Sequence, residues 1–423
     1  MKLVSLIRPV YLLQIILILL MAGCQRELPP TPLPPEAPKV QTQPELGEVF
    51  ATDSMQAIPW SEAPVNLFQE QKLDTWADAL MQSAVYYRRI KPDKVIFDGS
   101  PPVTADKMAK ACTELAQLAR NGEMKQLQEV LQNRFQLLRS VGYKRGDVLV
   151  TGYYEPLLHG SLTRSKRYFY PIYRRPPDML HDDQGTYRLV KGKRARYFSR
   201  SQIDDRLINK PYSDKQTGAL ANRGLELVWV DDPIVAFFLH IQGSGRVVLE
   251  NGQMMRIGYA ATNGHAYVAI GRILIEEGKL TAQEMTMPRL RQWLIDNPKE
   301  NQRLFFANQS YVFFHELKGD PVGNINVPLT PDRSIATDHR LFPKGAPAII
   351  TTTLPVLAPD GKTVTGWRPE DRFVVNQDTG GAIRGTGRVD LFFGFGKHVD
   401  IAAGVMKQNR SKLYFIAPRP DKP

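Results

Sequence analysis

Cysteine is scarce in this sequence of 423 residues, and motifs typical of metal or nucleotide binding are not found in it. It contains only Cys24 and Cys112, which excludes a Cys-x-x-Cys metal site. The seven histidines include no His-Glu-x-x-His motif and no close pair, so we predict no metal ion. No Gly-x-Gly-x-x-Gly or P-loop sequence opens a predicted helix, and we predict no cofactor.

Long hydrophobic runs are also missing. The apolar stretch Val10–Leu20 follows a positively charged start and is too short to predict a membrane-spanning helix, so residues 1–23 are typical of a signal peptide. Two small residues precede Cys24, and the pattern resembles a bacterial lipobox with Met21 where Leu is usual. We therefore expect lipidation of Cys24; the alternative is an ordinary signal peptide with an incidental cysteine. Gln25, in place of an Asp, favours the periplasmic side of the outer membrane over the inner membrane.

The balance of charge is strongly basic, with a net charge of +12 that favours an anionic partner. Nucleic acid and a carboxylate-rich polymer both fit this charge, but an envelope protein rarely meets nucleic acid, so we predict no nucleic-acid partner. Eleven Lys and Arg against three Asp lie between Gly160 and Arg200, with aromatic residues among them. We interpret this tract as a basic wall for a carboxylate-bearing polymer; a solvated cationic face is the alternative.

The order of patterns along the chain predicts an α+β protein that is mainly β. Seven prolines between Pro29 and Pro44 indicate an extended spacer. Apolar residues at helical spacing predict helices over residues 73–87, 106–118, 123–138, 267–278 and 281–297. Alternation predicts strands over residues 147–156 and 225–261, the second stretch broken by turns that include the hairpin signal Asn251-Gly252.

Three aspartates occur in the most informative part of the sequence. Asp378 ends an apolar strand pattern and precedes Gly380 and Gly381, and Asp390 lies twelve residues later in a second apolar strand. Asp338 ends the upstream stretch 327–338. The glycines between the strands permit tight turns and a close approach of the backbone to a ligand.

This aspartate triple resembles the 3D domain, which is named for three aspartates and built as a double-psi β-barrel. Tyr153-Tyr-Glu-Pro156 and His240-Ile-Gln-Gly-Ser-Gly-Arg246 resemble motifs of the insert domain of the membrane-bound lytic transglycosylase A family. The resemblance spans about Gly146 to Gly404. It implies a double-psi β-barrel catalytic domain with N-terminal helices, interrupted by a second, β-barrel-like insert domain, with a glycan-binding groove between them.

The expected segments follow from this resemblance and from the N-terminal patterns. They are a lipoprotein signal peptide (1–23), the lipidated cysteine with a proline-rich tether (24–46), the helical part of the catalytic domain (47–155), the insert β-domain (156–318) and the 3D barrel domain (319–423).

The resemblance also implies an activity. Such a protein would be a lyase of the exotransglycosylase type that cleaves the MurNAc-GlcNAc β-1,4 bond of peptidoglycan and leaves 1,6-anhydro-MurNAc ends. Asp390 matches the catalytic acid, and Asp378 and Asp338 match the supporting carboxylates. Residues expected to bind substrate are Tyr153, Tyr154, Glu155, Gln242, Ser244, Gly380 and Gly381. We expect a monomer.

The chemistry sets a requirement on Asp390. Glycoside cleavage needs a proton on the leaving oxygen, whereas an ordinary aspartate has a pKa near 3.9. Burial and a nearby like charge both raise that pKa. The apolar neighbours Val389, Leu391, Phe392 and Phe393 suit the first, and Asp378 would supply the second if the two strands met. Because the C6 hydroxyl of the muramic acid attacks its own C1, one carboxyl can act as acid and then as base.

Other interpretations stay open at this point. Glu155 is the main rival for the acid. The single Asp378-Thr-Gly tripeptide would suit an aspartic protease only in a symmetric dimer, because such proteases need two aspartates. A non-catalytic peptidoglycan-binding envelope lipoprotein is the alternative outside the enzymes.

Overall fold

A computed structural model describes residues 54–69, 73–98, 101–205 and 212–419. The predicted signal peptide, Cys24 and the proline-rich tether lie outside these residues. One compact unit comprises Glu48–Pro423. In the part of the chain that is described, none of the helices combines the length and hydropathy needed to cross a membrane.

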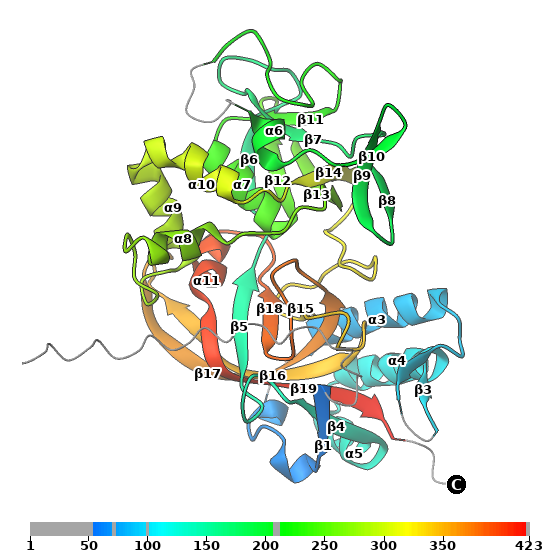
Figure 1. Cartoon of the computed structure of the whole chain (residues 1–423). Coiled ribbons are helices and arrows are strands. Elements are labelled where there is room, and N and C mark those ends of the chain that lie inside the picture. The colour runs from blue at the N-terminus through cyan, green and yellow to red at the C-terminus, as the bar shows by residue number, and fades with distance from the viewer. Residues whose placement is uncertain (1–53, 70–72, 99–100, 206–211, 420–423) are drawn as a thin grey trace, which may run out of the picture. The chain divides into compact units, whose positions relative to one another are not determined.

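A closed barrel forms the lower body in Figure 1. Its sheet contains β1 (Met55–Ile58), β4 (Phe135–Ser140), β5 (Val148–Tyr153), β15 (Ser334–Ala336), β16 (Pro347–Leu357), β17 (Val364–Asp378), β18 (Arg388–Phe392) and β19 (Lys407–Pro418). The strand order is β1-β4-β19-β16-β17-β15-β18-β5, and β5 pairs again with β19. The six strands from β19 to β5 therefore form a closed ring, and β4 and β1 extend it.

Helices cover one side of this barrel. They are α3 (Asp74–Arg89), α4 (Ala105–Asn121) and α5 (Met124–Arg134), with the short elements η1 (Trp60–Glu62), η2 (Leu67–Gln69), β2 (Val95–Phe97) and β3 (Val103–Thr104) around them. Trp76 of α3 stacks on Phe373 of β17 with ring centroids 4.4 Å apart, which fixes the helix layer on the sheet. The helix predicted over 123–138 is wrong at its end, because Phe135 and Leu137 alternate inward in β4 and pair with β19.

A second β-body is inserted between β5 and β15. It contains β6 (Leu157–Ser161), β7 (Tyr170–Tyr173), β11 (Glu226–Val230), β12 (Ser244–Leu249), β13 (Met254–Thr262) and β14 (Val312–Leu317), in the order β14-β13-β12-β6-β11-β7. A bridge between Arg174 and Phe314 brings the two edges of this sheet together. A separate sheet is formed by β8 (Leu180–Asp182), β9 (Gly185–Val190) and β10 (Lys193–Arg196).

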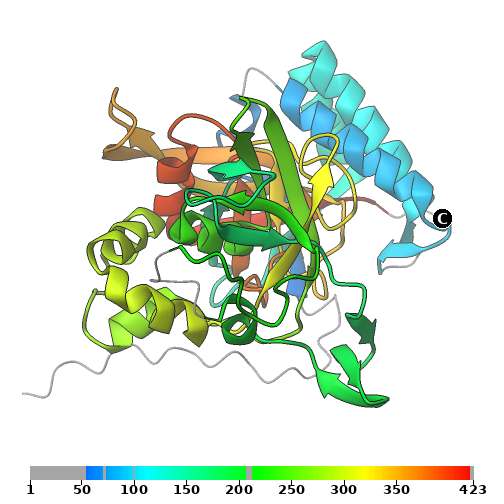
Figure 2. The same cartoon turned by 90° about the horizontal axis from the view of Figure 1, so that it is seen from above.

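The remaining helices gather mainly on the second body. They are α6 (Arg200–Asp204), α7 (Pro233–Gln242), α8 (Ile270–Glu276), α9 (Met287–Asp296), η3 (Pro298–Glu300) and α10 (Asn301–Ala307), while α11 (Val399–Val405) precedes β19 in the barrel. Figure 2 shows α8 to α10 on one side of the six-stranded sheet and the three-stranded sheet on the other.

Two predicted elements of this body need correction. The strand pattern over 225–261 is interrupted by α7, because Asp232 caps a helix by accepting hydrogen bonds from the amides of Ile234 and Val235, and Pro233 suits its first turn. The run is apolar on all sides, so its period does not separate helix from strand. The helix predicted from Thr281 begins only at Met287; its N-cap is Thr286.

The predicted fold class is confirmed: the chain is mainly β, with a closed six-stranded barrel and a barrel-like insert. The hairpin predicted at Asn251-Gly252 joins β12 to β13. The double-psi topology and the domain boundaries at 155/156 and 318/319 stay predictions.

Candidate active site

A row of four side chains crosses one face of four neighbouring strands. Ala336 of β15 pairs with Asp378 of β17 on one side and with Asp390 of β18 on the other. Asp390 in turn pairs with Thr151 of β5. Residues directly opposite each other in adjacent strands project from the same face of a sheet. The two carboxylates therefore flank the small methyl group of Ala336, and β5, β18 and β15 lie side by side in Figure 1.

Asp390 has the electrostatics of a proton donor. Its Oδ1 accepts a hydrogen bond of 2.7 Å from the Thr151 hydroxyl. Burial raises the pKa of Asp390 from 3.8 to about 6. The Arg388 guanidinium and the Thr151 hydrogen bond oppose this rise in pKa, and the Asp378 carboxylate adds to it. A group with this pKa holds a useful protonated fraction near neutral pH.

Asp378 is held from two directions. Its Oδ2 accepts a hydrogen bond of 2.9 Å from the Tyr153 hydroxyl, and its Oδ1 accepts one of 3.0 Å from the amide of Asn324. Burial raises the pKa of Asp378 to about 6, against the effect of these hydrogen bonds. Tyr153 is buried beside both aspartates, and burial followed by their negative charge raises its pKa well above 10.

The apolar surroundings of Asp390 differ from the expected ones. Val389 and Leu391 belong to the main hydrophobic core, on the opposite face of β18 from Asp390. Phe392 lies on the same face as Asp390 and packs with Tyr153 in a small cluster that also contains Leu329, Ala336 and Ile383. Strand alternation explains the difference, because only every second residue of β18 faces the site.

The carboxylate of Asp338 is held by several hydrogen bonds. Its two oxygens accept hydrogen bonds of 2.9 and 2.6 Å from Arg340 and one of 2.9 Å from the amide of Gly385. Burial alone would raise the pKa of Asp338, but Arg340 and the backbone amides outweigh it and lower the pKa to about 2. A carboxylate so firmly ionised cannot supply a proton near neutral pH. It anchors the loop between Asp378 and Asp390 at Gly385.

Glu155 is occupied by an ion pair. Its Oε2 accepts hydrogen bonds of 3.1 and 3.0 Å from Arg246, and the side chain is almost completely buried. Burial raises the pKa of Glu155 and Arg246 opposes that rise. The Arg246 guanidinium lies 4.1 Å from the ring centroid of Phe395, and the Glu155 amide donates to the Gly394 carbonyl. This cluster joins the second body to the barrel, so Glu155 is a weaker candidate for the acid than Asp390.

The sequence comparisons address the same two bodies. Residues 149–315 match the family described as the MltA specific insert domain, and residues 333–416 match the 3D domain. The solved lytic transglycosylase LtgG of Burkholderia pseudomallei is 34% identical, over 87% of this chain and 96% of that chain, with a TM-score of 0.52. The chain belongs to the membrane-bound lytic murein transglycosylase A family.

Other relatives agree with this membership. The solved membrane-bound lytic murein transglycosylase of Agrobacterium tumefaciens is 28% identical, over 86% of this chain and 98% of that chain, with a TM-score of 0.72. The membrane-bound lytic murein transglycosylase A of Vibrio cholerae serotype O1 is 31% identical over 269 residues, which are 63% of this chain and 64% of the relative. The chain thus spans just under two thirds of that curated relative.

The other residues expected to bind substrate lie in different elements around the aspartate row and in the turn after Asp378. Gln242 ends α7 and accepts a hydrogen bond of 3.0 Å from the amide of Tyr154, so it fixes the backbone beside Tyr153. Ser244 opens β12 opposite Gly258. Gly380 accepts hydrogen bonds from Ile383 and Arg384 within a turn, and Gly381 is exposed. Their role in substrate binding stays a prediction for this family member.

Thr151, Arg388 and Asn324 were not predicted as site residues. Thr151 lies two residues before Tyr153 in the same strand, so alternation alone would have placed both on one face. Asn324 offered no such signal, because its contact with Asp378 depends on how the chain returns from the insert.

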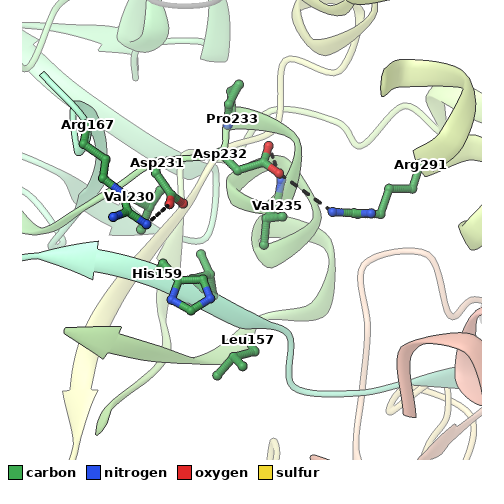
Figure 3. Close-up of a pocket in the computed structure, with 10 residues that line it drawn as sticks. Leu157, His159, Arg167, Val230, Asp231, Asp232, Pro233, Val235 and Arg291 are labelled. Carbon is green, nitrogen blue, oxygen red and sulfur yellow. Dashed lines mark hydrogen bonds and ion pairs between the residues drawn. The ribbon is translucent and has the colours of Figure 1, made fainter. Parts of the chain in front are cut away.

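Two cavities of this family member lie away from Asp390. A cavity of about 720 Å³ lies in the second body and a smaller one of about 350 Å³ lies beside β14, and neither is lined by an aspartate of the row (Figure 3). The predicted groove between the bodies stays a prediction. Among the described residues no group of three potential ligands could hold a metal ion. Cys112 is buried, and burial raises the pKa of its thiol to about 12, which makes it inert.

Proposed function

We propose that this chain is a peptidoglycan lytic transglycosylase that cleaves the MurNAc-GlcNAc β-1,4 bond with Asp390 as its acid and then its base. One observation carries the proposal. Asp390, a partly buried carboxyl with a pKa near 6, lies in the part of the chain that matches the 3D domain and accepts a hydrogen bond from Thr151. Only strand β15, with Ala336 at this position, lies between Asp390 and Asp378. A protein that only bound glycan would need no carboxyl with an elevated pKa.

The proposed reaction has two proton transfers through one group. Protonated Asp390 gives its proton to the glycosidic oxygen as the bond to C1 of MurNAc breaks. The resulting carboxylate then takes the proton of the C6 hydroxyl while that oxygen bonds to C1, and the 1,6-anhydro ring closes. Asp390 ends protonated, as it began, and no water is consumed. Burial keeps the pKa of Asp390 high, and Asp378, held by Tyr153, adds to that rise.

Asp390→Asn tests the assignment, because the amide preserves size and cannot give up a proton to a leaving oxygen. We expect turnover of purified sacculi to fall by at least about 100-fold, with glycan binding retained. Asp360→Asn is the matched control, since Asp360 accepts a hydrogen bond only within an exposed turn of the same barrel. Robust cleavage by the Asp390 variant would refute its role.

The products test the reaction type separately. Transglycosylase products should carry anhydro ends and be lighter by one water than hydrolysis products in their mass spectrum. Reducing ends would identify a muramidase, and the absence of any soluble product would identify a glycan-binding lipoprotein.

The location is part of the proposal. The relatives from Vibrio cholerae and Agrobacterium tumefaciens are named as membrane-bound proteins. For this chain we infer a monomer on the periplasmic side of the outer membrane, anchored by lipid at Cys24, with peptidoglycan strands as its substrate. Cys24→Ala should abolish incorporation of labelled fatty acid and move the protein from the outer-membrane fraction. Unchanged labelling would exclude Cys24 as the lipid site.

A further inference from the structure

A cavity in the second body contains charges of both signs. It is formed by β6, the end of β11, the start of α7 and by α9, and it has a volume of about 720 Å³. Figure 3 shows Asp231 and Asp232 side by side at its rim, with Arg167 facing the first and Arg291 facing the second. Leu157 and Val235 add apolar surface to the lining.

The two arginines are only loosely engaged by these aspartates. Arg167 lies 3.7 Å from Asp231 and Arg291 lies 3.8 Å from Asp232, distances too long for hydrogen bonds. Their side chains are 69% and 47% exposed. Oδ1 of Asp232 accepts from the first amides of α7, so that residue is fixed in place. Neither guanidinium group donates a hydrogen bond to another described residue, and that of Arg167 also lies 5.0 Å from the ring centroid of Tyr168. Both groups therefore keep donors that a ligand in the cavity can use.

Such a lining selects a ligand with both a carboxylate and an ammonium group. Guanidinium groups bind carboxylates through paired N–H donors, and a carboxylate beside them binds an ammonium group. A glycan strand without stems offers only the lactyl carboxylate of MurNAc and no ammonium group. We propose that this cavity binds the peptide stem of peptidoglycan, with Arg167 and Arg291 each on a separate stem carboxylate, because they lie on opposite sides of the two aspartates (Figure 3), and with Asp231 on the stem amine. This inference rests on the proposed function, because it names the part of the same substrate that the second body would take.

The cavity lies within reach of the aspartate row. Leu157 at its edge follows Tyr153 by four residues, which span at most about 14 Å. An extended stem of four or five residues spans about 14 to 18 Å. Arg291 also acts on the same segment: burial raises the pKa of Tyr154, and the charge of Arg291 opposes that rise. A glycan ring near Tyr153 can therefore bring its stem to the side of the cavity formed by Leu157 and Arg291.

The test compares glycan strands that carry stems with strands from which an amidase has removed them. The wild-type protein should have a KM about fivefold to tenfold lower for strands with stems. In Arg167→Gln/Arg291→Gln this preference should fall by about fivefold to tenfold, toward equal KM values, because two partly exposed ion pairs are lost. Arg272→Gln is the control, since the side chain of Arg272 is 72% exposed in α8 and pairs with Glu276 outside the cavity. It should keep the wild-type preference.

A direct binding measurement separates this inference from the proposed function. A soluble stem tetrapeptide with a free D-alanine carboxylate and a free diamino-acid amine should bind the wild-type protein at millimolar concentration in a calorimetric titration, and should not bind the double variant. Equal KM values for both kinds of strand in the wild type, or tetrapeptide binding that survives in the double variant, would overturn the stem site while leaving cleavage intact. If neither strand is cleaved, the proposed function fails, and the titration still decides whether the cavity binds stems.

Discussion

Replacing Asp390 with Asn should stabilise the folded protein at neutral pH while it removes the proposed acid. Burial raises the pKa of this carboxyl from 3.8 to about 6, so the folded chain binds more protons than the unfolded chain between these two pH values. Stability therefore falls as the pH rises through this window, by about 1.36 kcal/mol per pH unit. The difference between 6 and 3.8 gives an upper limit of about 3 kcal/mol, and partial exposure of the side chain reduces it.

The neutral amide of the variant carries no charge to bury, so the variant does not lose this stability as the pH rises. Its amide oxygen still accepts the Thr151 hydrogen bond. Urea unfolding of both proteins at pH 3.5, 5 and 7 measures the gap. The variant should gain little at pH 3.5 and about 1–3 kcal/mol at pH 7. The other buried carboxyls titrate in both proteins and cancel in the difference. A variant that is no more stable at pH 7, or a gap that does not change with pH, would refute the reasoning.

Three further outcomes follow from the same contacts. Asp338→Asn should lower the unfolding free energy by up to about 2 kcal/mol at pH 7, because the folded protein lowers the pKa of the Asp338 carboxyl to about 2. Urea titrations should show this loss of stability shrinking as the pH falls from 4 towards 2. In the pH profile of sacculus cleavage, Thr151→Val should raise the pKa of Asp390 and move the falling limb to higher pH, whereas Asp378→Asn should move it to lower pH; shifts in one common direction would contradict the assigned causes. Arg246→Met should lower the unfolding free energy by about 3 kcal/mol by leaving buried Glu155 unpaired, and adding Glu155→Gln should restore part of that loss; full stability of the single variant would exclude a structural role for the pair.

The sequence predicted what depends on local pattern. Alternation and glycines placed Asp378 at the end of one strand and Asp390 within a second, and those strands are present as β17 and β18. Which strands are neighbours is a matter of long-range pairing. β15 lies between β17 and β18, and Thr151 reaches Asp390 from 239 residues away in the sequence. No local pattern contains that pairing, so Thr151 was missed.

The dependence on long-range pairing also explains other differences between the sequence predictions and the structure. Glu155 looked like a free acid because its partner Arg246 is 91 residues away. The helix α7 was missed because its residues are apolar on every side, and the pattern then has no period to measure. Val389 and Leu391 flank Asp390 in sequence but lie in the barrel core, so sequence neighbours are poor guides to the environment of a strand residue.

The account depends on one carboxyl that is protonated when it meets the glycosidic bond, and the pH dependence of kcat/KM for sacculus cleavage measures that state directly. With Asp390 as the acid, kcat/KM should fall above a pH of about 6, tenfold for each further pH unit, as the group loses its proton. A rate that stays constant from pH 5 to 8, or a falling limb that persists unchanged in Asp390→Asn, would contradict the account.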